Sequence, residues 1–116
     1  MNLIYLASPY LKRPIPDPKI AEERYQKAID ATAYLMKQGF AVYSPIVATH
    51  PVALKHKLPL GSEYWLQFDE VILSRCTEVF VLQIDGWKES PGVQREIQLA
   101  KELGKEVTYL SELAIL

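Results

Sequence analysis

The sequence predicts an α/β fold: a doubly wound parallel sheet of about four to five strands, with helices on both faces, in a single domain over residues 1–116. Apolar runs typical of buried strands alternate along the chain with amphipathic segments of helical period. In addition, 49% of the 116 residues are hydrophobic and 23% are charged, which is ordinary for a globular domain large enough to bury a core.

The first strand is expected over Asn2 to Ala7, an apolar run without alternation. The prolines of Tyr10 to Pro18 exclude the interior of a helix, so this stretch is expected to be an extended loop. Asp17 then supplies a helix cap and Pro18 a first helical residue. Apolar residues recur at helical spacing from Lys19 to Gln38, which predicts a helix there.

A second, short strand is expected over Phe40 to Tyr43 and ends at Ser44-Pro45. The segment Ile46 to Gly61 contains Pro51 and Pro59, and it is expected to be mostly loop with about one helical turn. A connection of that length in a small domain is usually functional or mobile.

A second helix is expected to begin at Ser62, with a buried side that comprises Tyr64, Trp65, Phe68, Ile72 and Cys76. Cys76 is the single cysteine, and we expect it to fill the core rather than act as a nucleophile. A third strand, Glu78 to Ile84, follows.

Asp85 to Glu89 is expected to form a loop, and Ser90-Pro91 to open a third helix that runs through Leu103. A last strand is expected over Glu106 to Tyr109, after which Ser111 caps a final turn. This regular alternation is typical of flavodoxin-like or Rossmann-like sheets, whose ligands bind beyond the carboxyl ends of the strands.

The charge balance narrows the class of partner. Thirteen basic and fourteen acidic residues give a formal charge of −1, which argues against a nucleic-acid polymer as the partner. The apolar run Met1 to Leu6 is too short for a signal peptide or a membrane span, so we expect a cytoplasmic protein without a membrane partner. Two histidines without neighbouring cysteines predict no metal site, and we expect no cofactor.

The segment Ser90 to Glu96 is the sharpest candidate for a ligand site. Ser90 as cap, followed by Pro91 and the bare backbone of Gly92, leaves free amides at a helix start, where an anion such as phosphate is favoured. Glu96 lies on the same face as Gly92, roughly 9 Å further along the axis than Ser90, a span comparable to a sugar with its phosphate. An ordinary capped helix with a solvated glutamate is the alternative.

Two carboxylates stand at the edges of apolar helical faces, where an acidic group is costly unless it is paired or used. Glu96 neighbours Val93 and Ile97, and Asp69 lies beside Trp65 and Ile72. Carboxylates from two helices at the ligand end of a sheet are what glycosyl transfer needs. A structural salt bridge is the alternative for Asp69.

Two further side chains are candidates at the strand ends. Tyr5 interrupts an aliphatic strand, and its hydroxyl needs a partner, either the carboxylate of Glu96 or the backbone. His50 follows the second strand and is expected either to touch a ligand or to organise its loop.

The segment Tyr5 to Tyr10, the segment Ser44 to Pro51, Asp69, and the segment Gly86 to Glu96 together resemble the nucleoside 2'-deoxyribosyltransferase-like superfamily. Within it, the chain resembles the small bacterial and phage proteins of the DUF1937 family. The resemblance implies that Glu96 is a nucleophile that attacks the anomeric carbon. It also implies that Asp69 assists proton transfer to the base, that Tyr5 orients Glu96 and that Ser90 binds a 5'-phosphate.

The same resemblance places Ser8, Pro9, His50 and Gly92 at the substrate, and it leaves Trp87 as either a wall that stacks on the base or a dimer contact. Exposed aromatic residues and the leucine-rich tail, Leu110 to Leu116, also favour a homo-oligomer. No residue of this tail is assigned to a neighbouring subunit's site.

The sequence therefore predicts a nucleotide N-glycosidase or a (deoxy)ribosyltransferase-like enzyme that acts on a small nucleotide or nucleoside. Near neutral pH, Glu96 is expected to be ionised and Asp69 partly protonated. The alternative is a non-catalytic module that binds a nucleotide or a sugar nucleotide.

Overall fold

The computed structural model describes residues 2–12 and 15–116, and it forms the predicted α/β fold. Its strands are β1 (Leu3–Ala7), β2 (Ala41–Tyr43), β3 (Glu78–Gln83) and β4 (Glu106–Ser111). Its helices are α1 (Pro18–Lys37), α2 (Pro45–His56), α3 (Ser62–Arg75) and α4 (Pro91–Glu102), with a final 3-10 turn, η1 (Glu112–Ile115).

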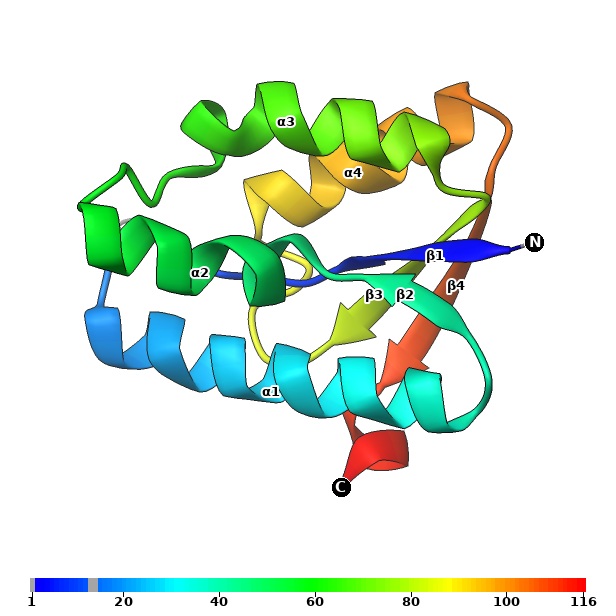
Figure 1. Cartoon of the computed structure of the whole chain (residues 1–116), viewed down its shortest axis with the longest axis horizontal. Coiled ribbons are helices and arrows are strands. Elements are labelled where there is room, and N and C mark those ends of the chain that lie inside the picture. Colours follow the sequence, from blue (N-terminus) through cyan, green and yellow to red (C-terminus); the bar gives the residue numbers. More distant parts are fainter. Residues whose placement is uncertain (1, 13–14) are drawn as a thin grey trace.

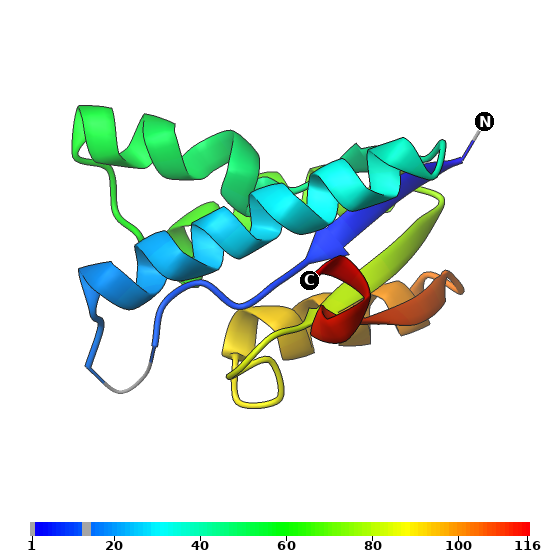
Figure 2. The same ribbon diagram turned by 90° about the horizontal axis from the view of Figure 1, so that it is seen from below.

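The four strands are parallel in the order β2-β1-β3-β4. The chain leaves β1 toward β2 on one side and later places β3 on the other side, so the strand order reverses between β1 and β3. Helices α3 and α4 cover one face of the sheet (Figure 1). Helix α1 and η1 cover the opposite face, which Figure 2 shows from below. The sheet is therefore doubly wound, as the alternation of elements predicts.

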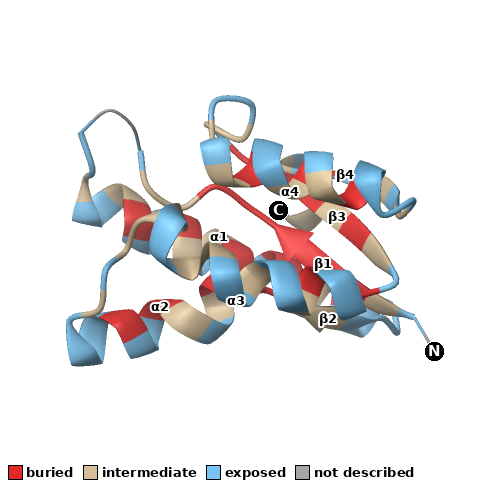
Figure 3. Cartoon of the chain, turned by 90° about the horizontal axis from the view of Figure 1, so that it is seen from above, coloured by how far each residue is buried: buried red, intermediate tan, exposed pale blue. Residues whose placement is uncertain are grey.

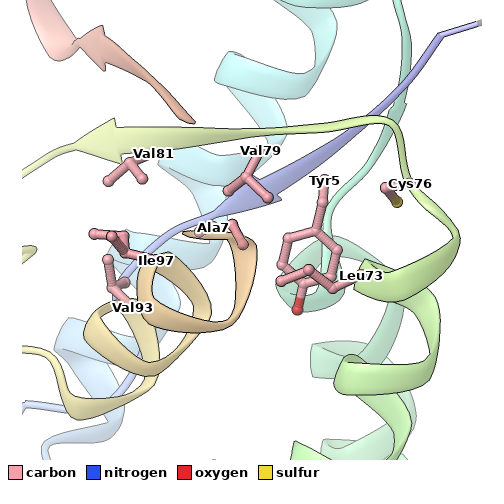
Figure 4. Close-up of a cluster of buried hydrophobic side chains, with 9 residues drawn as sticks. Tyr5, Ala7, Leu73, Cys76, Val79, Val81, Val93 and Ile97 are labelled. Carbon is pink, nitrogen blue, oxygen red and sulfur yellow. The ribbon is translucent and has the colours of Figure 1, made fainter. Parts of the chain in front are cut away.

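Alternate residues of the strands build a core on each face. Tyr5 and Ala7 of β1 pack with Val79 and Val81 of β3 beneath α3 and α4 (Figure 4). On the other face, Leu6 packs with residues of α1, β3 and β4. Strand β1 is accordingly buried over most of its length, as Figure 3 shows.

Helix α2 corrects the expectation of a loop over residues 46–61. The hydroxyl of Ser44 accepts a hydrogen bond from the amide of Val47 at 3.2 Å, and Pro45 occupies the first turn. Ile46, His50 and Ala53 are buried at helical spacing, and the helix continues through Pro51 to His56. The capped start and the buried stripe outweigh the one hydrogen bond that an interior proline removes.

Helices α1 and α4 and the turn η1 begin at the capping residues that the sequence predicts. Asp17 accepts from the amide of Lys19 at 2.9 Å before α1, and Ser90 accepts from the amide of Val93 at 3.2 Å before α4. Ser111 caps η1 through the amide of Leu113 at 3.2 Å. In the stretch predicted as an extended loop before α1, Arg13 and Pro14 lie outside the described residues, and the others form neither helix nor strand up to Pro18.

The buried side of α3 differs from the expectation in part. Tyr64 and Phe68 are 37% and 46% exposed, and Leu73 is the helix residue that is fully buried. The helix is rotated so that Trp65, Asp69 and Leu73 line the cleft described below. Cys76 is buried just after the helix, as expected.

Within the part of the chain that the structure describes, no helix combines the length and the hydropathy needed to cross a membrane.

Candidate functional site

A cleft lined by residues of α2, α3 and the start of α4 opens beyond the carboxyl ends of β1 and β3. This is where the strand order reverses, and it is where ligands of doubly wound sheets bind. Six of the residues predicted to form a site line it: Ser8, His50, Asp69, Ser90, Gly92 and Glu96.

Glu96 is held in place by Tyr5. The ring of Tyr5 is fully buried beside Leu73 (Figure 4). The hydroxyl of Tyr5 donates a hydrogen bond to Oε2 of Glu96. Of the two partners left open for this hydroxyl by the sequence, the structure has the carboxylate. Because Tyr5 is part of the central strand, the bond orients Glu96 relative to the sheet.

Asp69 reaches the same cleft from α3, and its Oδ1 atom is buried without a hydrogen-bond partner among the residues that the structure describes. The charge of Asp69 also raises the pKa of Glu96, so the two carboxyl groups are close enough to interact. A salt bridge, the alternative role for Asp69, is absent from the described residues. An unpartnered buried carboxyl oxygen is costly and marks a position that a ligand can satisfy.

The protonation of the pair is the reverse of the expectation. Burial raises the pKa of Glu96 to about 8, although the hydrogen bond from Tyr5 lowers it, and burial raises the pKa of Asp69 to about 6. These shifts favour a proton on Glu96 over one on Asp69 near pH 7, and the two groups titrate as a pair because their charges interact. The pKa shift of Glu96 runs opposite to the expectation because burial of its carboxyl group disfavours the charged form more than the hydrogen bond from Tyr5 favours it.

The start of α4 forms one end of the cleft. Ser90 and Gly92 line it, with Arg95 one turn further on. A Cβ atom added at Gly92 would lie 3.5 Å from Cβ of Ser62 on α3, an ordinary contact that narrows the cleft. The exposed amides of this turn are suited to an anion.

His50, on α2, forms the wall nearest to β1. It is only 4% exposed, and its Nδ1 atom is hydrogen-bonded to the hydroxyl of Tyr10. Its Nε2 atom lies 3.4 Å from Oε1 of Glu22, and its ring stacks on Tyr25 with centroids 4.2 Å apart. His50 therefore lines the cleft and joins α2 to the segment after β1 and to α1, while its contact with a ligand stays a prediction.

Three predicted residues lie outside the lining of the cleft. Tyr5 acts through Glu96, and Pro9 is buried beneath the surface. Trp87 is not part of the cleft lining: its indole packs on Tyr109 of β4, with centroids 5.5 Å apart, and against the core under α4, and its contact with a base or with a second copy of the chain stays a prediction. Burying the indole against β4 takes it away from the cleft.

Several cleft residues were not predicted. Tyr10 was part of a recognised segment without a role, and the apolar wall of α2 and α3 comprises Ile46, Ala53, Leu60, Trp65 and Leu66. The pair Ser44-Pro45 was the signal that could have revealed α2, since it repeats the Asp17-Pro18 and Ser90-Pro91 starts.

The cleft combines two interacting carboxyl groups, the start of a helix and apolar walls. Among the described residues, no three His, Cys, Asp or Glu side chains are grouped so as to hold a metal ion.

The family model described as a domain of unknown function, DUF1937, matches residues 2–112. No curated protein matches the chain. The match covers both strands of the reversal point and every residue of the cleft, and the chain belongs to the DUF1937 family.

Proposed function

We propose that the protein cleaves the N-glycosidic bond of a nucleoside 5'-monophosphate, with transfer of the sugar to a second base as a close variant. The observation that carries this proposal is the meeting of Tyr5, Glu96 and the unpartnered Asp69 in a cleft that ends at the capped start of α4. The resemblance to the nucleoside 2'-deoxyribosyltransferase-like superfamily agrees with it.

The cleft suggests how the substrate lies. The 5'-phosphate is placed at the amides of α4 near Ser90 and Gly92, and the sugar follows the helix face toward Glu96. The base then lies against the apolar wall of α2 and α3, which includes Ile46 and Trp65. This arrangement puts the anomeric carbon beside the two carboxyl groups.

In the first step, a carboxylate oxygen of Glu96 attacks C1' and the bond from C1' to the base nitrogen breaks. The base leaves with its bonding electrons and takes a proton from Asp69. In the second step, water attacks C1' and releases Glu96, while Asp69 accepts the proton of the water. With a base as the acceptor in place of water, the same step gives transfer.

The first step needs an ionised Glu96 and a protonated Asp69. The pair reaches this state when one proton moves from Glu96 to Asp69. Their pKa values of about 8 and about 6 differ by about two units, which corresponds to about 3 kcal/mol. This cost is small beside the barrier that a glycosidase lowers. Tyr5 stabilises the ionised form of Glu96 by donating to it.

The proposal is tested by incubating a panel of nucleoside 5'-monophosphates with the protein and separating released base by chromatography. Free base and sugar phosphate are expected from the wild type and not from Glu96→Ala. A new nucleotide that appears only when an acceptor base is added identifies transfer. Release of base that is unchanged in Glu96→Ala contradicts the proposal.

A non-catalytic nucleotide-binding module is a second candidate, and one observation favours it. Burial raises the pKa of Glu96 to about 8, and a protonated carboxyl group is a poor nucleophile. Such a module binds nucleotides without turnover and retains its affinity in Glu96→Gln. Calorimetric titration of both proteins beside the chromatographic assay separates the two candidates.

A further inference from the structure

A chain of three polar side chains runs from the surface of α1 into the cleft. Glu22 lies about half exposed on α1, His50 is buried on α2, and Tyr10 follows β1 and lines the cleft. Nε2 of His50 lies 3.4 Å from Glu22, and Nδ1 is hydrogen-bonded to Tyr10. Of these three residues, Tyr10 is the one whose hydroxyl oxygen is left to meet a ligand. Tyr10 lies in the loop after β1.

The proton positions along this chain follow from the chemistry of its first member. A carboxylate can only accept, so Nε2 of His50 carries the hydrogen that points at Glu22. In the neutral imidazole, Nδ1 is then the acceptor, and the Tyr10 hydroxyl donates its only hydrogen to it. Burial and the charge of Glu22 raise the pKa of Tyr10 to about 12, so the phenol keeps this hydrogen to give.

The hydroxyl oxygen of Tyr10 is therefore left with lone pairs alone. A ligand group that meets it must donate a hydrogen bond, and a ligand carbonyl at that place would be repelled. The edge-on packing of the two rings, with centroids 5.4 Å apart, restricts where these lone pairs point.

A second observation indicates a polar ligand group at this wall. Ser8, two residues before Tyr10, is only 8% exposed, lines the cleft, and its Oγ atom has no hydrogen-bond partner among the described residues. A buried hydroxyl without a partner is costly. A ligand with a polar edge satisfies it.

We infer that Tyr10 determines specificity by accepting a hydrogen bond from an N–H or O–H group of the substrate, and that His50 and Glu22 are positioning residues that keep its oxygen an acceptor. The inference rests on the proposed function and deepens it. The donor is assigned to the exocyclic amino group of the base, because Tyr10 shares its wall of the cleft with the apolar residues Ile46 and Ala53 of α2. A sugar hydroxyl is the other source of the same chemistry.

The test compares two matched pairs of substrate. Cytidine and uridine 5'-monophosphates differ at the exocyclic group, an amino group in the first and a carbonyl in the second. Cytidine 5'-monophosphate and its 2'-deoxy form differ in the sugar hydroxyl. For each pair, the ratio of kcat/KM for base release is measured, or the ratio of Kd by calorimetry where no base is released.

The wild type is expected to prefer the cytosine nucleotide, and Tyr10→Phe to reduce this preference by about tenfold, the equivalent of one hydrogen bond of about 1.4 kcal/mol. Phenylalanine keeps the edge-on packing with His50, so the fold is expected to persist, and thermal unfolding verifies it. If Tyr10→Phe changes only the ratio between cytidine 5'-monophosphate and its 2'-deoxy form, the inference holds with the sugar hydroxyl as the donor.

Glu22→Ala tests the positioning role of Glu22, because a residue that only supports the fold would not change the ratio between the two substrates. Without the carboxylate, His50 can donate from Nδ1, and Tyr10 then turns its hydrogen to the ligand, so the preference is expected to fall although Glu22 is not part of the cleft lining. Glu23→Ala is the matched control, because Glu23 is the neighbouring exposed acid on α1 and lies outside the cleft.

The outcomes separate the two proposals. Nucleotides that are cleaved or bound with ratios unchanged in Tyr10→Phe overturn the role of Tyr10 and leave the proposed function standing. A ratio that falls in Tyr10→Phe but not in Glu22→Ala overturns the positioning role of Glu22. A wild type that neither binds nor cleaves any nucleotide overturns both proposals.

Discussion

Arg24 lies so close over Gly86 that a Cβ atom at Gly86 would clash with its Nη2 atom. The guanidinium donates to the backbone oxygen of Asp85 at 3.1 Å and to that of Tyr10 at 3.4 Å. A single buried side chain of α1 thereby ties the segment after β1 to the loop after β3, the two segments that carry Tyr10 and Ser90 into the cleft.

Gly86→Ala is expected to destabilise the protein by about 2–4 kcal/mol, because Gly86 has a φ of +91° and the new methyl group displaces Arg24. Urea denaturation measures the loss. Gly39→Ala is the matched control, since Gly39 has a similar φ of +95° and open space around it. In an Arg24→Ala background, the cost of Gly86→Ala is expected to fall to that of Gly39→Ala, and a cost that stays the same in both backgrounds would refute the contact.

The stability of the protein is expected to fall as the pH rises. Burial holds the pKa of Glu96 near 8 and that of Asp69 near 6, above their ordinary values of 4.5 and 3.8. The folded state therefore binds more protons than the unfolded state between about pH 4 and 8, so the free energy of unfolding decreases through this window. The free energy of unfolding, measured by urea denaturation, is expected to be about 4–5 kcal/mol lower at pH 8.5 than at pH 5. Glu96→Gln should remove most of the difference, and a variant with the same slope as the wild type would argue against a buried acid at this position.

The rate of base release is expected to follow a bell-shaped pH profile with limbs near 6 and 8. Below the first limb both carboxyl groups are protonated and no nucleophile forms. Above the second both are ionised, and no proton is left for the departing base. The two limbs belong to the pair rather than to single residues, because the charges interact. Asp69→Asn is expected to remove the bell, and kcat/KM across the range measures it.

Tyr5→Phe is expected to lower kcat/KM by about tenfold and to move the alkaline limb to higher pH. The hydrogen bond from Tyr5 lowers the pKa of Glu96, so its loss makes the carboxyl group harder to ionise. The pH dependence of base release measures both effects. Tyr43→Phe is the control, because the ring of Tyr43 lies 6.2 Å from that of Tyr5 and no hydrogen bond joins it to Glu96. Equal profiles for the two variants would show that Tyr5 only fills space.

Ser90→Ala and Ser44→Ala together separate capping from binding of phosphate. Each hydroxyl caps its helix at 3.2 Å, so each variant is expected to lose about 1 kcal/mol of stability. Only Ser90 lines the cleft, so only Ser90→Ala is expected to weaken binding of a nucleoside 5'-monophosphate more than binding of the nucleoside. Calorimetric titration with both ligands measures this, and equal losses for the two ligands would place the phosphate elsewhere.

The fold could be predicted because its signals are local. The buried run at Leu3 to Leu6 and the caps at Asp17 and Ser90 each depend on neighbours within a few residues. Helix α2 was missed because Pro51 and Pro59 were weighed against a helix, whereas the buried stripe that stabilises it is visible only once β1 and α1 are packed against it.

The candidate site was only partly predictable, because some of its contacts join residues that are far apart in the sequence. Glu96 and Asp69 stand out because acids rarely flank apolar helical faces. The contact of Tyr10 with His50 joins residues 40 positions apart, and that of His50 with Glu22 joins residues 28 apart, so no local pattern reports them. The order of the two pKa values depends on how deeply each carboxyl group is buried, which is a property of the packed helices.

The position of β1 at the centre of the sheet also affects how the chain is made. Strand β1 is made before the other strands of the sheet, yet it pairs on one side with β2 and on the other with β3, where Ile4 lies opposite Glu78. A nascent chain that stops short of β3 has no partner for that edge, so its most apolar strand stays open to chaperones and to other unfinished chains. Closure of the sheet around β1 must therefore wait until β3 has been made.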